Sequence, residues 1–385
     1  MISDHTLLKV LYRREKSLLG RTPEARRRAR RLEGLLRRAL RLRERQFPAA
    51  GGHLEKLFLI MTRACQLRCR YCPMTKSGRA MPEGVLKRGL ELFFAGEGTR
   101  LQLHFFGGEP LLRFDQMRRA VRIAEALRAR TGKQVRYLVT TNGLNLSDAM
   151  IGFFRRHRFT VVMSADGSEK TFGLQRPGVR GGNYYGRARS ALEKLKDSGV
   201  SYYITAVVSP ESAGRLPENV RHLVSLGHKK IEITYEVGRE WPPKAVAELL
   251  RGVGFLMEEA RRTRGFEIVN ATDLRWEPVV LKSEMALDVD GGLYRHVGIL
   301  LEKRKLAKED FFVASIDSLR TMDDRAFSPF DDFMILARAY RRRNAALRRV
   351  VVNNIEVGWA LERFLRTRGP RKNSARVSEK FVGRS

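Results

Sequence analysis

Apolar and polar residues alternate along the middle of the chain in blocks whose period changes repeatedly. Segments rich in β-branched and aromatic residues predict six strands, at Lys56–Thr62, Leu101–Phe106, Val135–Thr140, Thr160–Ser164, Tyr202–Val208 and Ile231–Tyr235. Apolar residues at helical spacing predict helices over residues 82–95, 114–130, 147–156, 184–198, 216–226 and 243–263. This alternation is typical of a parallel sheet buried on both faces, and six units predict a partial (βα)6 TIM-like barrel, an α/β fold.

The first 52 residues predict a basic helical extension before the barrel. Thr22 and Pro23 are typical of a helix start, with Thr22 as the cap. Apolar residues then recur at helical spacing among many arginines, at Leu32, Leu35, Leu36, Ala39 and Leu40. We expect this stripe to pack on the barrel and the arginines to be solvated; alternatively, the helix lies on anionic lipid or RNA. Residues 47–52 predict a linker.

We assign the barrel core to residues 53–240. After residue 240 the alternation of apolar and polar residues is less regular. Residues 241–368 predict a degenerate α+β domain, with helices over 329–348 and 355–367. Residues 369–385 are polar and basic, which predicts a disordered tail.

All three cysteines of the chain lie in one short window, at Cys65, Cys69 and Cys72. Three closely spaced thiolates can hold three irons of a 4Fe–4S cluster and leave the fourth iron open. A structural zinc site needs a fourth ligand, and the nearest histidines, His53 and His104, are not at zinc-finger spacing. A disulfide would leave one thiol unpaired. Zinc and inert thiols therefore stay as alternatives to the cluster.

Polar turns follow several of the predicted strands, as the cysteine window follows the first. They are Gly107-Gly108-Glu109-Pro110, Thr141-Asn142-Gly143 and Ser164-Ala165-Asp166-Gly167. The carboxyl ends of parallel strands meet at one edge of the sheet, so these turns and the cysteines are expected to converge on one site. The two glycines would let the backbone approach a ligand closely, although each turn is also compatible with a simple loop.

The spacing Cys-x3-Cys-x2-Cys, with Tyr71 before the last cysteine, resembles the signature of the radical S-adenosylmethionine (radical SAM) superfamily. Gln66 stands where many members have asparagine, a position that is not a ligand. In that family the open iron binds S-adenosylmethionine, and one-electron reduction gives a 5′-deoxyadenosyl radical. The resemblance implies an enzyme with one 4Fe–4S cluster and a low-potential electron donor of the flavodoxin or ferredoxin type.

The resemblance also assigns cofactor contacts. The Gly107–Pro110 turn matches the segment whose backbone and acid engage the methionine amino group, and Arg176 matches an arginine that binds the methionine carboxylate. Ser164 matches a position that hydrogen-bonds a ribose hydroxyl. The complete implied set is Tyr71, Gly107, Gly108, Glu109, Pro110, Thr141, Asn142, Ser164, Asp166 and Arg176. Loop capping remains the alternative for the last five, and shielding of the cluster for Tyr71.

Ser164-Ala165-Asp166-Gly167 together with Arg176-Pro177 resembles the sulfatase-maturase-like branch, whose members modify peptides and proteins and carry SPASM or twitch C-terminal domains. Residues 290–296 resemble the Asp-Gly-x-x-Tyr-Pro-Cys hairpin of those domains, with His296 in the cysteine position. An ordinary hairpin histidine is one interpretation of His296, and a substrate or metal group is the other. No cysteine follows Cys72, which excludes auxiliary clusters held by cysteines. The resemblance implies a peptide or protein substrate.

Charge adds a competing hypothesis. The chain has 75 basic and 42 acidic residues, a net charge of +33, which attracts polyanions such as RNA. RNA modification, or non-catalytic nucleic-acid binding by an iron–sulfur or zinc protein, is therefore the alternative function. We find no apolar run near 18 residues and no signal-peptide core, and closely spaced reduced cysteines predict a cytoplasmic protein. The sequence singles out no acid or base among Glu236, Asp273, Glu277 and Asp288.

Overall fold

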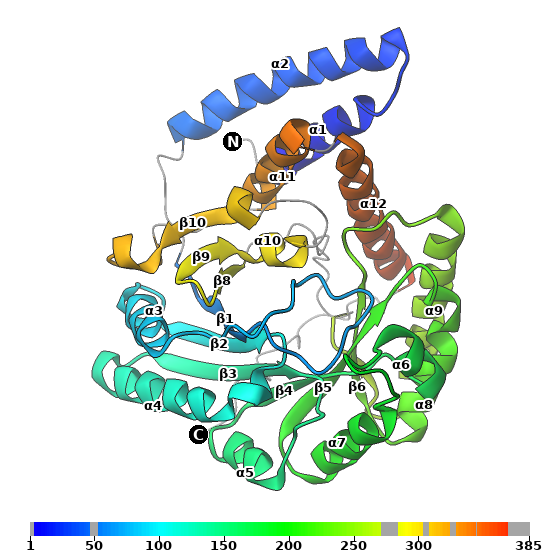
Figure 1. The fold of residues 1–385 in the computed structure, drawn as a ribbon. Coiled ribbons are helices and arrows are strands. Elements are labelled where there is room, and N and C mark those ends of the chain that lie inside the picture. The colour runs from blue at the N-terminus through cyan, green and yellow to red at the C-terminus, as the bar shows by residue number, and fades with distance from the viewer. Residues whose placement is uncertain are drawn as a thin grey trace.

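The computed structural model describes residues 4–46, 53–270, 284–302, 308–323, 329–343 and 345–368. Its centre is a mostly parallel sheet of ten strands among these residues, in the order β10-β9-β8-β1-β2-β3-β4-β5-β6-β7 (Figure 1). The strands are β1 (Lys56–Thr62), β2 (Arg100–Gly107), β3 (Gln134–Thr141), β4 (Thr160–Ser164), β5 (Ser201–Val208), β6 (Lys230–Tyr235), β7 (Glu267–Ile268), β8 (Met285–Leu287), β9 (Gly292–Arg295) and β10 (Phe312–Ser315).

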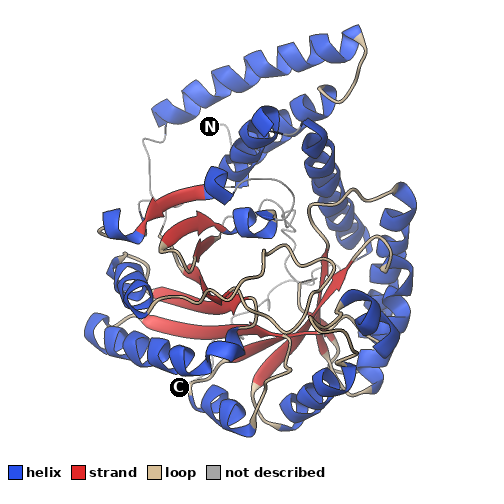
Figure 2. Cartoon of the chain, viewed as in Figure 1, coloured by secondary structure: helices blue, strands red, loops and turns tan. Residues whose placement is uncertain are grey.

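Helices cover the outer face of the curved sheet (Figure 2). They are α3 (Glu83–Ala95), α4 (Phe114–Thr131), α5 (Asp148–Arg156), α6 (Glu169–Gln175), α7 (Tyr185–Asp197), α8 (Leu216–Ser225) and α9 (Pro243–Arg262). The predicted partial α/β barrel is confirmed, and the predicted bounds of its six strands and six helices agree with the structure to within one residue. The short α6 and the two-residue β7 were not predicted.

Strand β1 lies in the interior of the sheet, because β2 pairs with one of its edges and β8 with the other. Its residues from Leu57 to Thr62 are all at most 4% exposed. A continuous run of buried residues is typical of a parallel strand covered on both faces. The loop that follows β1 therefore starts from one of the most firmly held positions in the fold.

The C-terminal strands extend the barrel sheet. Strand β8 pairs in parallel with β1, matching Leu57 with Met285, and β9 and β10 follow as antiparallel neighbours. The short helix α10 (His296–Leu300) comes directly after β9. The domain boundary expected near residue 240 remains a prediction, but β8, β9 and β10 belong to the same sheet as the barrel strands.

Two N-terminal and two C-terminal helices form a second core beside the barrel: α1 (Asp4–Ser17), α2 (Pro23–Gln46), α11 (Pro329–Arg343) and α12 (Ala345–Arg368). The Thr22 cap is confirmed, since its hydroxyl accepts a hydrogen bond from the Ala25 N–H at 3.1 Å. The expectation that the stripe of α2 packs on the barrel is wrong. Helix α2 packs on α1, which was not predicted, and Leu36 joins the second core, whereas Leu35 is 47% exposed.

The helix break predicted between residues 348 and 355 is also wrong, because α12 is continuous there. Asn353 and Asn354 have low helix propensity, but their side chains bind the loop after β6. The Asn354 side chain accepts from the Gly238 N–H at 2.7 Å and donates to the Arg239 carbonyl at 2.6 Å. These tertiary hydrogen bonds offset the weak local preference.

Several predictions concern segments outside the described residues. These are the linker at 47–52, the tail at 369–385, and the candidate acids Asp273 and Glu277. None of the helices that the structure describes is long and apolar enough to cross a membrane.

Candidate active site

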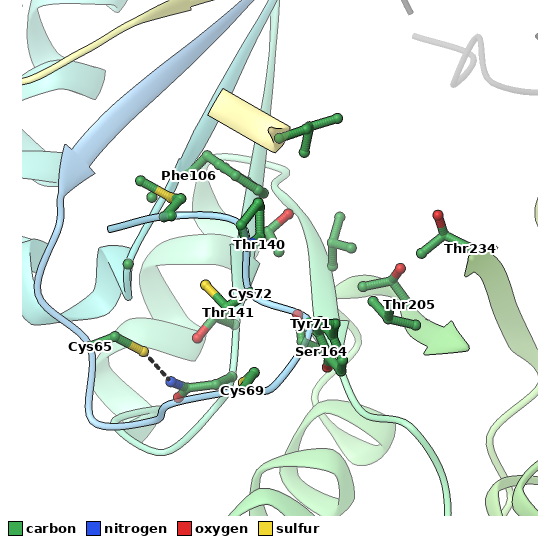
Figure 3. A pocket seen from close by; sticks show the side chains of 18 of the residues that line it. Cys65, Cys69, Tyr71, Cys72, Phe106, Thr140, Thr141, Ser164, Thr205 and Thr234 are labelled. Atoms are coloured by element: carbon green, nitrogen blue, oxygen red, sulfur yellow. Dashed lines mark hydrogen bonds between the residues drawn. The ribbon is translucent and has the colours of Figure 1, made fainter. Parts of the chain in front are cut away.

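The three cysteines line one cavity of about 320 Å³ at the carboxyl ends of the barrel strands. All three thiols are free, and each side chain is half-buried. Figure 3 shows Cys65, Cys69 and Cys72 on the loop after β1, with Thr205 and Thr234 across the cavity. The loop is tied to residues 175–179 by three backbone hydrogen bonds of 2.8–2.9 Å. The predicted convergence of cysteines and polar turns is therefore present.

Nitrogen donors surround the thiols. The Leu67 N–H lies 3.4 Å and the Asn142 side-chain amide 3.6 Å from the Cys65 sulfur. Burial raises the pKa of Cys69 to about 12, although the positive charge of Arg176 acts against this increase. Burial of Lys76 acts to lower its pKa, but nearby Cys72 and Cys65 raise it on balance. An ammonium group is therefore available beside the thiolates.

These residues fit an iron–sulfur cluster. Cysteine thiolates are the usual ligands of such clusters, and hydrogen bonds to sulfur tune them. Among the described residues, no three His, Cys, Asp or Glu side chains converge closely enough to hold one metal ion.

Gly107 and Gly108 pack the second strand against the cysteine loop. A Cβ atom on Gly108 would overlap the carbonyl oxygen of Ala64, directly before Cys65. Gly107 has a φ of +125°, in the region that favours glycine. Both line the cavity, but the close approach that they permit is to the protein backbone. The close approach of this turn to a ligand remains a prediction.

Glu109 joins the ends of β2 and β3. Its carboxylate is 1% exposed and accepts hydrogen bonds from the Thr141 hydroxyl at 2.7 Å, the Asn142 N–H at 2.8 Å and the Leu111 N–H at 3.0 Å. Burial raises the pKa of Glu109, while these hydrogen bonds lower it in part. Pro110 begins the short 3-10 helix that follows (Pro110–Arg113) and is buried away from the cavity. The carboxylate therefore fixes the relative positions of two turns of the cavity wall.

Asp166 organises the opposite wall without lining the cavity itself. It accepts hydrogen bonds from Nε and Nη2 of Arg176, both at 2.8 Å, and from the Tyr71 hydroxyl at 2.8 Å. The Arg176 guanidinium also lies 5.4 Å from the centre of the Tyr71 ring. Tyr71, Ser164 and Arg176 do line the cavity. The structure thus brings the predicted residues together, with Asp166 behind two of them.

Sequence reasoning missed several polar residues that line the cavity. Most occupy inward positions on otherwise apolar strands: Lys56 on β1, His104 on β2, Tyr203 on β5 and Glu232 on β6. A charged or imidazole side chain within an otherwise apolar strand could have indicated that the residue faces the cavity. Lys76 and Glu284 were also missed, and His296 lines the cavity with them.

Of the four acids named from the sequence, two are described. Glu236 is 3% exposed and lines the cavity. Asp288 is fully buried elsewhere, in ion pairs with Arg63 and Lys308. Glu236 is therefore the one of these two that a bound molecule can approach.

Comparison with known proteins agrees with this geometry. A serine-type anaerobic sulfatase-maturating enzyme of Klebsiella aerogenes is 29% identical over 203 residues, which cover 50% of this chain and 50% of that protein. The match therefore spans only half the length of that relative.

Two solved structures share the fold. Native anSMEcpe with bound AdoMet has a TM-score of 0.62 at 17% identity, covering 72% of this chain and 82% of that one. Streptococcus suis SuiB bound to precursor peptide SuiA has a TM-score of 0.52 at 14% identity, covering 84% and 76%. The family model of the radical SAM superfamily matches residues 59–251, half of the chain, including all three cysteines and the turns around them. The chain belongs to the radical SAM superfamily.

Proposed function

We propose that this protein is a radical SAM enzyme that modifies a peptide or protein substrate. The observation that carries the proposal is the placement of Cys65, Cys69 and Cys72 on the same cavity as the Glu109 turn and Arg176. In this function the three cysteines hold a 4Fe–4S cluster. When bound and reduced, such a cluster would supply one electron for cleavage of S-adenosylmethionine to methionine and a 5′-deoxyadenosyl radical.

The cavity walls would bind the two charged ends of the methionine moiety. A carboxylate has about four acceptor positions, so Glu109 can accept from an ammonium group in addition to its three protein donors. Asp166 binds Nε and Nη2 of Arg176, and an anion in the cavity would bind through Nη1. The Glu109 carboxylate and the Arg176 guanidinium are both buried and held by protein partners. They are therefore ordered before the cofactor binds, which lowers the entropy cost of binding.

The remaining predicted contacts shape the same seat. Gly107 and Gly108 bring the second turn against the cysteine loop, and Pro110 begins the helix that holds it. Thr141 and Asn142 bind Glu109, and the Asn142 side-chain amide also reaches the Cys65 sulfur. Ser164 and Tyr71 supply hydroxyl groups on the opposite wall. Their roles are to orient the reacting atoms and exclude water, since the cofactor carries the chemistry.

The substrate class is supported by relatives. A sulfatase-maturating enzyme and a protein solved with its precursor peptide are among the similar proteins. No cysteine follows Cys72 that could hold an auxiliary cluster. We therefore propose three possible fates for the product radical. It takes up a hydrogen atom from a donor other than a cysteine of this chain, it loses a proton and returns one electron to the single cluster, or it leaves with the product. A low-potential flavodoxin or ferredoxin would supply the first electron.

Anaerobic reconstitution tests the enzymatic proposal. With iron, sulfide, dithionite and S-adenosylmethionine, the wild-type protein is expected to turn brown and form 5′-deoxyadenosine. Cys69→Ala removes one of only three ligands and should abolish both signals while most of the fold persists, as circular dichroism would show. A colourless zinc protein, or a cluster that never cleaves S-adenosylmethionine, would falsify the proposal.

A second candidate is an RNA substrate, which the surface of α2 favours. Arg27, Arg31 and Arg38 are exposed on this helix, which lies at the outer edge of the molecule (Figure 1). Arginine forks bind phosphate in a bidentate manner, and such binding weakens steeply with salt. Retardation of tRNA but not of peptide at moderate salt would support this alternative. Replacing the three arginines with serine should then reduce the salt dependence of binding, whereas Arg118, Arg119 and Arg122 on α4 serve as the matched control.

A further inference from the structure

The cavity has a second polar end, away from the cysteine loop. Lys56 begins β1, whereas the cysteine loop follows Thr62 at the end of this strand. At about 3.3 Å per residue, the two ends of β1 are about 20 Å apart. The cofactor contacts proposed above do not use the polar side chains at this end of the cavity. Lys56 begins β1 and Glu284 directly precedes β8, while His104 pairs with Phe58 and the His296 N–H donates to the Glu284 carbonyl.

His296 is held firmly among aromatic rings at this end. His296 is 6% exposed. The imidazole stacks on Phe58, with ring centres 4.0 Å apart, and meets the edge of Phe106 at 5.5 Å. Phe58 also stacks on His104 at 4.5 Å. Such packing leaves the His296 ring little freedom to turn.

The hydrogen bonds of His296 define which nitrogen carries its proton. Nδ1 lies 3.2 Å from Oε2 of Glu284, and Oε1 of Glu284 lies 2.6 Å from the Lys56 ammonium. An ionised carboxylate can only accept, so Nδ1 must carry a proton and donate it. In the neutral imidazole, Nε2 is then a bare acceptor.

Nε2 of His296 is buried, and no group among the described residues hydrogen-bonds to it. A buried polar atom without a partner costs free energy, and such atoms are uncommon in native structures. His296 lines the cavity, so a molecule bound there would supply the missing donor once a small shift of the surrounding aromatic side chains uncovers Nε2.

We propose that His296 Nε2 accepts a hydrogen bond from an N–H or O–H group of the substrate, and that Glu284 is the residue that positions it. The ligand class is therefore a hydroxyl- or amide-bearing group that enters between the aromatic side chains. This inference rests on the proposed function in one respect, that the substrate occupies the barrel cavity. It places a specificity-determining group on the hairpin where the related branch has a cysteine.

The protonation state is tested first, by nitrogen NMR of the full chain labelled at histidine and carrying its reconstituted cluster. His296→Phe assigns the signal, and the wild-type protein should show a proton on Nδ1 and none on Nε2. In Glu284→Gln the amide oxygen should face the Lys56 ammonium and the amide N–H₂ should face Nδ1, which moves the proton to Nε2. A purely structural role for Glu284 would leave the tautomer unchanged.

Binding is tested with phenol and toluene, two probes of similar size that differ in one O–H donor. Phenol should shift the His296 Nε2 signal, and its affinity should fall about tenfold in His296→Phe and in Glu284→Gln. Toluene affinity should change less than about twofold, because the aromatic walls persist. Absence of a phenol response, an equal response to both probes, or a proton on Nε2 in the wild-type protein would each overturn the proposal. Formation of 5′-deoxyadenosine is measured separately, so failure here is distinguishable from failure of the proposed function.

Discussion

Asp166 and Arg176 form a bidentate ion pair, in which both nitrogen–oxygen distances are 2.8 Å. Each residue is 3% exposed. Ten residues apart in the chain, they connect the end of β4 with the segment after α6. The same carboxylate receives the Tyr71 hydroxyl next to Cys72. One buried acid therefore links the cysteine loop to the wall proposed to bind the methionine carboxylate.

Asp166→Asn should destabilise the protein strongly. Removing the negative charge leaves the Arg176 guanidinium buried without its counterion, and breaking a buried pair in this way costs about 3–5 kcal/mol. Denaturant unfolding followed by circular dichroism measures the loss. Asp148→Asn is the matched control, since the Asp148–Lys194 pair is exposed and should contribute less than about 1 kcal/mol. Equal losses in the two variants would show that the buried pair has no special role.

Gly108→Ala should prevent the cysteine loop from packing in its present position. The added methyl group overlaps the Ala64 carbonyl, which is backbone and cannot move aside like a flexible side chain. We expect a loss of roughly 1–3 kcal/mol, as for overpacking in a core, and a clear drop in reconstituted iron content. Gly152→Ala in α5 is the control, because nothing lies within 4 Å of its added Cβ. If the control lost iron as well, packing at Gly108 would not be the cause.

His228 should make stability depend on pH below neutrality. It is fully buried, its Nδ1 lies 2.9 Å from the Tyr202 hydroxyl, and burial lowers its pKa to about 4. Since the unfolded chain binds a proton near pH 6.5 and the folded protein near pH 4, stability is complete above pH 6.5 and declines as the pH falls toward 4. The decline attributable to His228 is about 3 kcal/mol.

This contribution is isolated by comparing wild-type protein with His228→Leu between pH 4 and 7, where both share the same carboxylates. The wild-type free energy of unfolding should fall more steeply with acid than that of the variant. Parallel curves would mean that His228 takes up its proton equally in the folded and unfolded states.

Asn354→Ala should loosen the contact between α12 and the barrel. The Gly238 N–H and the Arg239 carbonyl would lose their hydrogen bonds to the Asn354 side chain. Gly238 is buried, so its N–H would be left without a partner. A cost of about 2 kcal/mol is expected, against the small gain in helix propensity from alanine. Asn183→Ala, which removes an exposed asparagine from a loop, should cost less than half as much. A stabilised Asn354→Ala protein would contradict this explanation of the continuous helix.

The sequence allowed the barrel to be predicted because local pattern and fold agree there. Strands β1 and β4 have the predicted bounds, since their apolar runs are short and end at clear turns. The cysteine loop and the glycine turn could also be placed, because the topology alone brings the carboxyl ends of parallel strands together. No local pattern conflicted with the tertiary structure in this region.

The continuous helix α12 and the surroundings of His296 could not be predicted, because both depend on contacts between distant segments. Helix α12 continues through Asn353 and Asn354 because residues more than a hundred positions away bind their side chains. Likewise, nothing near His296 in the sequence indicates that it stacks on Phe58 and reaches Glu284. Local sequence propensity cannot predict such contacts between distant residues, because they form only when the sheet is assembled.

The pairing of β8 with β1 has a consequence for any shortened form of the chain. The family match ends at residue 251, but the edge of β1 that would otherwise be open is closed by Met285–Leu287. Cutting the chain after that match would turn an interior strand into a rim of unpaired amide groups, which invites strand exchange between molecules. Residues 285–287 thus keep β1, the strand that leads to the cysteine loop, inside the sheet.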